Sequence, residues 1–147
     1  GSAVVMGHEV GHATARHAGQ RMSQAMVTQY GLAGLDAALL GNSEYRETLM
    51  AGLGAGATVG VLLPYSRKHE YEADQLGMKY LAQAGYDPAV AITFWERFGQ
   101  LAKGQSTDFL STHPMTDKRL DEMRAYLPAA NELYAAAPRK YGAGETL

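Results

Sequence analysis

The chain of 147 residues contains no cysteine. A metal site built from thiolates is therefore excluded, and any bound metal must be held by histidine and carboxylate side chains. The sequence also lacks a basic block: its 13 basic and 15 acidic residues are spread along the chain and leave a net charge of -2. This balance argues against nucleic acid as a partner.

Long apolar runs are absent as well. The longest, Leu49–Leu63, has 15 residues and contains Gly52, Gly54, Gly56 and Gly60, whereas a membrane span needs about 20 apolar residues. We therefore expect a buried helix here, with a membrane-contacting hairpin as the alternative. No segment shows the alternation of a strand, so the sequence predicts a mainly α fold around a single core.

Capping and breaking residues divide the chain into expected helices at residues 3–30, 44–63, 66–84, 88–101 and 116–127, with a short one beginning at Pro128. Residues 31–42 are expected to break the helix or form a short one, and residues 103–112 a loop. Asn42 or Ser43 is expected to cap the second helix, and Pro64 to kink or end it. Gly85 fits the left-handed position that follows a helix.

The Asp87-Pro88 pair is a start signal, because an N-cap is followed by proline at the first helical position. Thr116 is expected to cap the next helix. The apolar side chains expected to face the core are Val90, Phe94, Phe98 and Leu101 in the first of these helices, and Leu120, Met123 and Leu127 in the second. Trp95 is also interpreted as a core residue.

The ends of the chain are expected to contribute little. Gly1-Ser2 resembles the remnant of a cleaved expression tag. Residues 138–147 have no periodic apolar signal and are expected to be a flexible tail. Residues 3–137 are then one domain.

The most informative stretch is His8-Glu9-Val10-Gly11-His12, which reads H-E-x-x-H. On a helix the two histidines lie about 40° apart and one turn from each other, so both imidazoles can meet one metal ion. Glu9 is turned about 100° from His8, which suits a general base that acts on a water molecule. A zinc site that does chemistry needs a third protein ligand and an open position.

Three glycines, Gly7, Gly11 and Gly19, lie in this first helix and weaken it by about 1 kcal/mol each relative to alanine. Close approach of another element to their backbone is the functional explanation that we expect; the alternative is that the glycines have no packing role.

A second stretch, Glu70 to Asp74, supplies carboxylates. On a helix these two residues form an i, i+4 pair at the head of an apolar face. Two carboxylates in that place are costly unless they are paired or metal-bound. We interpret Glu70 as the third ligand and Asp74 as the acceptor for the second ring nitrogen of a ligating histidine. A solvated acidic turn is the alternative.

Three blocks together carry a resemblance: H-E-x-x-H at His8–His12, S-R-x-x-E-x-E-A-D at Ser66–Asp74, and S-T-H-P at Ser111–Pro114. The chain from about Ala3 to Leu127 resembles the zinc metallopeptidase family that includes HtpX and the CAAX prenyl proteases. Its soluble bacterial periplasmic members and the stress-activated protease of the mitochondrial inner membrane look most similar.

The resemblance implies a zincin-like helical core that holds one zinc ion per chain through His8, His12 and Glu70, with Glu9 as the catalytic base and Asp74 in support. It places His113 and Arg119 near the active site. His113 is then an oxyanion or substrate group, or a lid on the open zinc position; fixing a turn before Pro114 is the alternative. His17 and His69 do not fit this arrangement and are interpreted as surface or packing residues.

The implied function is zinc-dependent endopeptidase activity on polypeptides, misfolded or membrane-associated ones by analogy, in the periplasm or at the membranes of the cell envelope. Family members have strand segments ahead of the histidine motif that this chain lacks. We therefore expect weak or absent proteolysis from it, and an exposed apolar surface that favours homo-oligomers. The rival interpretations are an inactive zinc-binding regulatory or scaffold domain, and a helical interaction module without metal.

Overall fold

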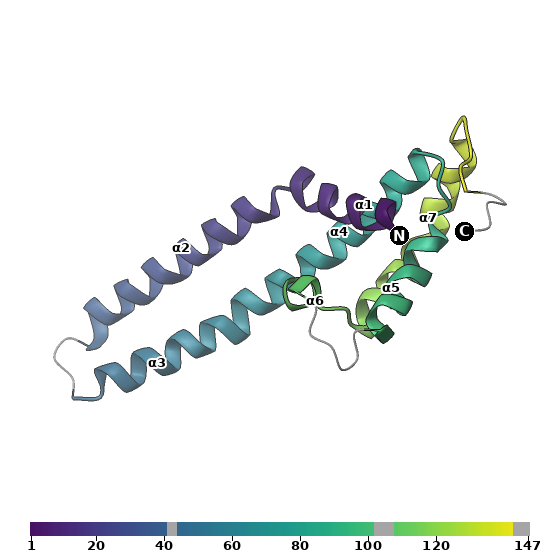
Figure 1. Ribbon diagram of the computed structural model, residues 1–147. Helices are drawn as coiled ribbons and strands as arrows, with labels where there is room; N and C mark the ends of the chain where they lie inside the picture. Colours follow the sequence, from purple (N-terminus) through teal and green to yellow (C-terminus); the bar gives the residue numbers. More distant parts are fainter. Residues whose placement is uncertain (41–43, 102–107, 143–147) are drawn as a thin grey trace. The chain divides into compact units, whose positions relative to one another are not determined.

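The computed structural model describes residues 1–40, 44–101 and 108–142 (Figure 1). Its helices are α1 (Ser2–Thr14), α2 (His17–Leu35), α3 (Arg46–Ala57), α4 (Leu63–Gln83), α5 (Ala89–Leu101), α6 (Asp108–Thr112) and α7 (Asp117–Ala136). Two π-helical turns, η1 (Asp36–Leu40) and η2 (Thr58–Leu62), follow α2 and α3. These described ranges contain no strand, only an isolated bridge between Tyr86 and Tyr141. The predicted mainly α class is confirmed.

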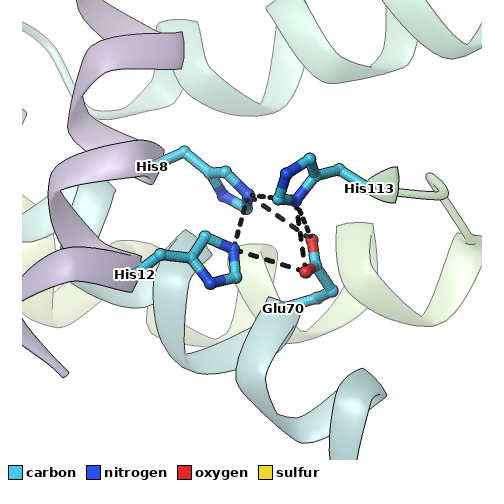
Figure 2. A group of neighbouring side chains, drawn as sticks. All are labelled: His8, His12, Glu70 and His113. Carbon is cyan, nitrogen blue, oxygen red and sulfur yellow. Dashed lines mark hydrogen bonds and ion pairs between the residues drawn. The ribbon is translucent and has the colours of Figure 1, made fainter. Parts of the chain in front are cut away.

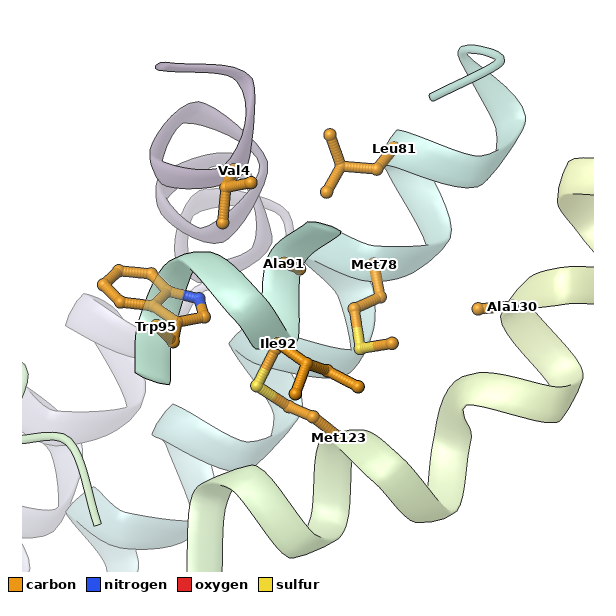
Figure 3. Close-up of a cluster of buried hydrophobic side chains, with 8 residues drawn as sticks. All are labelled: Val4, Met78, Leu81, Ala91, Ile92, Trp95, Met123 and Ala130. Carbon is orange, nitrogen blue, oxygen red and sulfur yellow. The ribbon is translucent and has the colours of Figure 1, made fainter. Parts of the chain in front are cut away.

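The chain forms two compact units. One consists of Gly1–Ala15 and Glu70–Leu147, and the other of Arg16–His69. The apolar core lies in the first unit, where α1, α4, α5 and α7 contribute side chains (Figure 3). Its buried members are Val4, Met78, Leu81, Ala91, Ile92, Trp95, Met123 and Ala130.

Helix α5 uses a different face from the one that its periodicity predicted. Ala91, Ile92 and Trp95 are buried, whereas Val90 is 47% and Leu101 79% exposed. The helix contacts both α1 and α7, and the small side chain of Ala91 lies in the core between Met78 and Trp95 (Figure 3). Packing on two neighbours therefore selected a face adjacent to the predicted stripe, with Phe94 and Phe98 partly buried at its edge.

The first predicted helix is two helices. Arg16 has a left-handed backbone with φ 58°, so α1 ends at Thr14 and α2 begins at His17. A non-glycine residue in this region cannot continue a right-handed helix. Residues 31–42 were expected to break the helix or form a short one. No break occurs at residue 31, because α2 continues to Leu35 and then into the short π-helical turn η1.

The apolar run Leu49–Leu63 is helical but not buried, which corrects our expectation. Neither α3 nor η2 has a buried residue. Pro64 does not end the helix: it lies inside α4, directly after η2. A π-helical turn widens the backbone where proline lacks its N–H and its ring would crowd the preceding turn. Within the described part of the chain, one helix, Arg46–Gln83, is long and apolar enough to cross a membrane by length and composition.

Several local signals are confirmed. Gly85 has φ +87° after the end of α4, the Asp87 carboxylate accepts the Ala89 N–H at 2.8 Å, and the Thr116 hydroxyl accepts the Arg119 N–H at 3.3 Å. Asn42 and Ser43 lie outside the described residues. Pro128 does not start a new helix, because α7 runs through it to pack Met123 and Ala130 on the core.

Two segments expected to be irregular carry structure. Asp108–Thr112 forms α6, while residues 102–107 of the expected loop lie outside the described part. In the tail, the Tyr141 N–H donates to the Gly85 carbonyl at 2.8 Å, which fixes its start against the end of α4. Residues 143–147 are outside the described range.

Candidate metal centre

Helices α1 and α4 approach each other at their glycines. A Cβ on Gly11 would lie 2.9 Å from the Ala73 carbonyl oxygen, and one on Gly7 3.1 Å from the Gly77 carbonyl oxygen. The predicted close approach is therefore confirmed at Gly7 and Gly11. It is wrong for Gly19, where nothing lies within 4 Å. The contact brings the histidines of α1 against the carboxylates of α4.

Four side chains converge beside this contact: His8 and His12 from α1, Glu70 from α4, and His113 after α6 (Figure 2). Each offers a ligand atom, and these atoms all lie within 4.8 Å of one another. The Nε2 atoms of His8 and His12 are 3.1 Å apart. The carboxylate oxygens of Glu70 lie 3.4 Å from the first and 3.3 Å from the second.

These separations fit a tetrahedral metal site. With metal–ligand bonds of about 2.0–2.1 Å, the edges of a tetrahedron around zinc measure roughly 3.3–3.4 Å. The three distances among His8, His12 and Glu70 lie between 3.1 and 3.4 Å. His113 lies at the same spacing, because its Nδ1 is 3.3 Å from the His8 Nε2 and 3.1 Å from a Glu70 oxygen. The donor types and spacing therefore suit zinc.

Asp74 fixes the orientation of His8. The His8 Nδ1 lies 2.9 Å from Asp74 Oδ1, and both side chains are buried. An ionised carboxylate only accepts, so this contact assigns the proton to Nδ1 and leaves the Nε2 lone pair facing the other ligand atoms. A carboxylate behind a metal-ligating histidine commonly has this role.

Arg119 is the buried cation beside these carboxylates. It is 1% exposed and donates to both Asp74 oxygens at 2.7 Å. Its Nη1 lies 3.1 Å from Glu70 Oε2 and also donates to the Pro114 carbonyl at 3.1 Å. One guanidinium thus balances two buried carboxylates and secures the turn that carries His113.

The site shifts the acid–base properties of two of these groups. Burial acts to raise the pKa of Glu70, but contacts with His113, His12, His8 and Arg119 hold that pKa well below its usual range. Burial acts to lower the pKa of His8, but the hydrogen bond to Asp74 and the nearby Glu70 carboxylate outweigh it, so this pKa is raised. The Glu70 ligand is therefore ionised, and at His8 a metal ion competes with a proton up to a higher pH than at a free imidazole.

Glu9 lies on the open side of the cluster. Its side chain is 48% exposed, and its Oε1 is 3.6 Å from the His113 Nε2. The His113 ring therefore lies between Glu9 and the other ligand atoms: Nδ1 faces Glu70 and Nε2 faces Glu9. A carboxylate that reaches solvent beside a metal centre is accessible to a water molecule.

Two aromatic side chains, Phe109 and Trp95, pack against His113 and His8. The sequence analysis did not identify Phe109. Phe109 stacks on the His113 ring with 4.8 Å between centroids and stacks on Trp95 at 5.8 Å. Trp95 also meets the edge of His8 at 5.5 Å. Phe109 fell in the predicted loop; its spacing of four residues from His113, one helical turn, is the signal that could have found it.

His17 and His69 lie outside the metal cluster and within the unit Arg16–His69. Both are buried, and their rings stack with centroids 4.2 Å apart. His69 Nε2 is 2.9 Å from the Gln20 amide oxygen. Of the two interpretations, surface or packing, the structure supports packing.

Comparison with known proteins identifies the class to which this arrangement belongs. A sequence profile of peptidase family M48 matches residues 2–127, most of the chain. The chain is therefore a member of peptidase family M48, and the resemblance drawn from its three motif blocks is confirmed.

Individual relatives include named metalloendopeptidases. The chain is 40% identical over 117 residues to mitochondrial metalloendopeptidase OMA1 of Arabidopsis thaliana, covering 80% of this chain and 22% of the relative. It is 34% identical over 146 residues to OMA1 of Saccharomyces cerevisiae, covering 91% and 38%. It is 30% identical over 128 residues to the beta-barrel assembly-enhancing protease of Escherichia coli, covering 83% and 26%.

The chain thus spans between about a fifth and two fifths of the length of these relatives. No solved structure matches it.

Proposed function

We propose that the protein is a zinc-dependent endopeptidase. One observation carries the proposal: the Nε2 atoms of His8 and His12 and the carboxylate of Glu70 converge at tetrahedral spacing, with the exposed carboxylate of Glu9 beside them. Membership of peptidase family M48 supports the same activity.

Zinc, when bound, supplies a Lewis acid that polarises the scissile carbonyl and makes a water molecule more acidic. Glu9 takes a proton from the attacking water and returns it to the leaving amine. Asp74 keeps His8 in the tautomer whose Nε2 faces the ion, and Glu70 contributes an ionised carboxylate. Arg119 holds both carboxylates in place without touching the reacting atoms.

His113 is proposed to act as a lid at the fourth ligand position. Its Nδ1 completes the ligand set and its Nε2 faces Glu9. A lid predicts that His113→Ala retains zinc while cleavage rises, because the substrate no longer competes with the imidazole. A role for His113 in stabilising the oxyanion predicts instead that cleavage falls while zinc is retained.

The second candidate is a zinc-binding regulatory or scaffold domain without activity. It is favoured by the same His113 contact, because four protein donors around one ion are typical of structural zinc sites. Peptidase activity of the full-length protein separates the two candidates.

The proposed substrates are polypeptides of the cell envelope. The proposed site of action is the periplasm or the membranes of the cell envelope, with a part in protein quality control. The name of the Escherichia coli relative, for enhancing beta-barrel assembly, supports a part in protein assembly.

The test combines zinc content with peptidase activity of the full-length protein. Glu70→Ala is expected to lose zinc and activity together, whereas Glu9→Gln is expected to keep about one zinc per chain and lose turnover. Glu72→Gln is the matched control, an exposed carboxylate on the same helix, and should keep both. Undiminished activity of Glu9→Gln would remove Glu9 from its role, and no zinc in the wild type would overturn the proposal.

A further inference from the structure

Phe109 and His113 are joined through both backbone and side chain. Phe109 is the second residue of α6, one helical turn before His113, and its carbonyl accepts the His113 N–H at 2.8 Å. The two rings stack with 4.8 Å between centroids and 25° between planes. Aromatic pairs prefer such offset arrangements, with centroids about 4.5–7 Å apart. The His113 imidazole therefore rests on the Phe109 ring.

The Phe109 ring is held in turn by the core. It stacks on Trp95 with 5.8 Å between centroids and 15° between planes. Trp95 is 1% exposed and belongs to the buried cluster of the first unit (Figure 3). It also meets the His8 ring at 5.5 Å. Through Phe109 and Trp95, the apolar core reaches both His113 and His8.

The backbone beside His113 is fixed separately from its ring. Arg119 Nη1 donates to the Pro114 carbonyl at 3.1 Å and to the His113 carbonyl at 3.4 Å. These bonds hold the turn but leave the imidazole able to rotate about its side-chain bonds. The ring nitrogens face Glu70 and the half-exposed Glu9 (Figure 2). Phe109 is the contact that ties the orientation of this ring to the core.

The stack becomes stronger when His113 acts as a ligand. The face of an aromatic ring carries negative charge density and attracts positive groups. An imidazole that binds a metal ion is more positive than a free one, so its attraction to the Phe109 ring increases. Phe109 therefore favours the orientation in which His113 Nδ1 lies beside the ligand atoms of His8 and Glu70. A leucine at position 109 is apolar but has no such face.

We propose that Phe109 is a positioning residue of the metal centre: its ring, held by Trp95, keeps the His113 imidazole at the fourth ligand position. The proposal rests on the proposed zinc site and goes beyond it, because it makes Phe109 responsible for how firmly His113 occupies that position. Replacement of Phe109 should then change metal binding only through His113.

Cobalt(II) binding to the whole protein tests the proposal without any need for peptidase activity. The visible absorption of Co²⁺ reports the geometry and type of its ligands. Phe109→Leu is expected to give the Co²⁺ spectrum of His113→Ala and to lower Co²⁺ affinity about tenfold. Phe109→Tyr keeps the ring face and is expected to retain the wild-type spectrum and affinity. If Phe109→Leu does not fold, Phe109→Met carries the same expectation as Phe109→Leu.

Phe98→Leu is the matched control. Phe98 is also partly buried against the core and contacts the rings of Phe109 and Trp95, but it stacks on Phe94 rather than on His113. Its variant loses a similar apolar contact, so it should lose stability in urea while the Co²⁺ spectrum stays unchanged.

A double variant separates support of His113 from support of the core. Residues that act through one another have non-additive effects. Phe109→Leu should therefore lower Co²⁺ affinity in the wild-type background but have no further effect on it in the His113→Ala background.

Three results would overturn the positioning role while the metal site itself stands. The first is a wild-type spectrum and affinity in Phe109→Leu. The second is the same spectral change in Phe98→Leu as in Phe109→Leu. The third is a full further loss of affinity when Phe109→Leu is added to His113→Ala. Failure of the wild type to bind either Co²⁺ or zinc is a different outcome, because it overturns the proposed function and the positioning role together.

Discussion

Replacing Gly11 with alanine tests whether the contact between α1 and α4 sets the metal geometry. The added Cβ would lie 2.9 Å from the Ala73 carbonyl oxygen and 3.1 Å from its Cα, where ordinary contacts begin at 3.4 Å. Both atoms belong to backbone, so they cannot rotate away. The two helices must therefore separate by about 0.5 Å, which is more than the ~0.2 Å that metal–ligand distances tolerate.

The magnitude follows from two opposing effects. Alanine favours the helix by about 1 kcal/mol over glycine, and overpacking costs about 1–3 kcal/mol. Gly19→Ala gains the first effect without the second, because nothing lies within 4 Å of Gly19. The Gly11→Ala variant should therefore be less stable than Gly19→Ala by about 1–3 kcal/mol, with zinc affinity reduced about tenfold, as for other changes that misplace a ligand.

Denaturant unfolding with a chelator present gives the stability difference, and a zinc titration of the folded proteins gives the affinity. Equal stability and equal zinc affinity of the Gly11→Ala and Gly19→Ala variants would refute the reasoning, because the close approach would then have no energetic consequence.

Arg119→Met is expected to lower the free energy of unfolding in urea by about 3–5 kcal/mol, because two buried carboxylates lose their cation. Arg124 is an exposed residue of the same helix, so Arg124→Met should change this free energy little. Similar values for the two variants would argue against the buried network. Zinc affinity is expected to fall by about tenfold per pH unit below the raised pKa of His8, because a protonated imidazole cannot bind the ion. A zinc affinity that stays constant from about pH 8 to 6 would contradict this expectation. Gly85→Ala and Gly142→Ala share the strain of positive φ, about 1–2 kcal/mol. Only at Gly85 does a backbone oxygen lie in the path of the added Cβ, so the Gly85→Ala variant should melt at the lower temperature. Equal melting temperatures would show that backbone strain alone matters.

Local signals in the sequence were sufficient wherever a residue's role depends on its near neighbours. Gly85, the Asp87-Pro88 pair and Thr116 marked helix ends because capping involves only a few adjacent residues. The helical character of nearly all the described chain followed from the lack of strand patterns. Pro128 was misjudged for the converse reason: core packing around it compensates for what proline removes. Pro64, which was expected to kink or end its helix, does not end it, and a π-helical turn lies directly before its helix.

The sequence by itself determined the candidate ligands, because H-E-x-x-H and the Glu70–Asp74 pair each place two functional groups one helical turn apart. That the two pairs meet was decided by the tertiary structure, in which Gly7 and Gly11 let α1 approach α4 and Arg119 joins Asp74 to Glu70 from a third helix. The tertiary structure also showed that Leu49–Leu63 is exposed rather than buried. The spacing of residues along a helix is a property of the sequence. Which face of that helix packs against another segment depends on residues that are distant in the sequence.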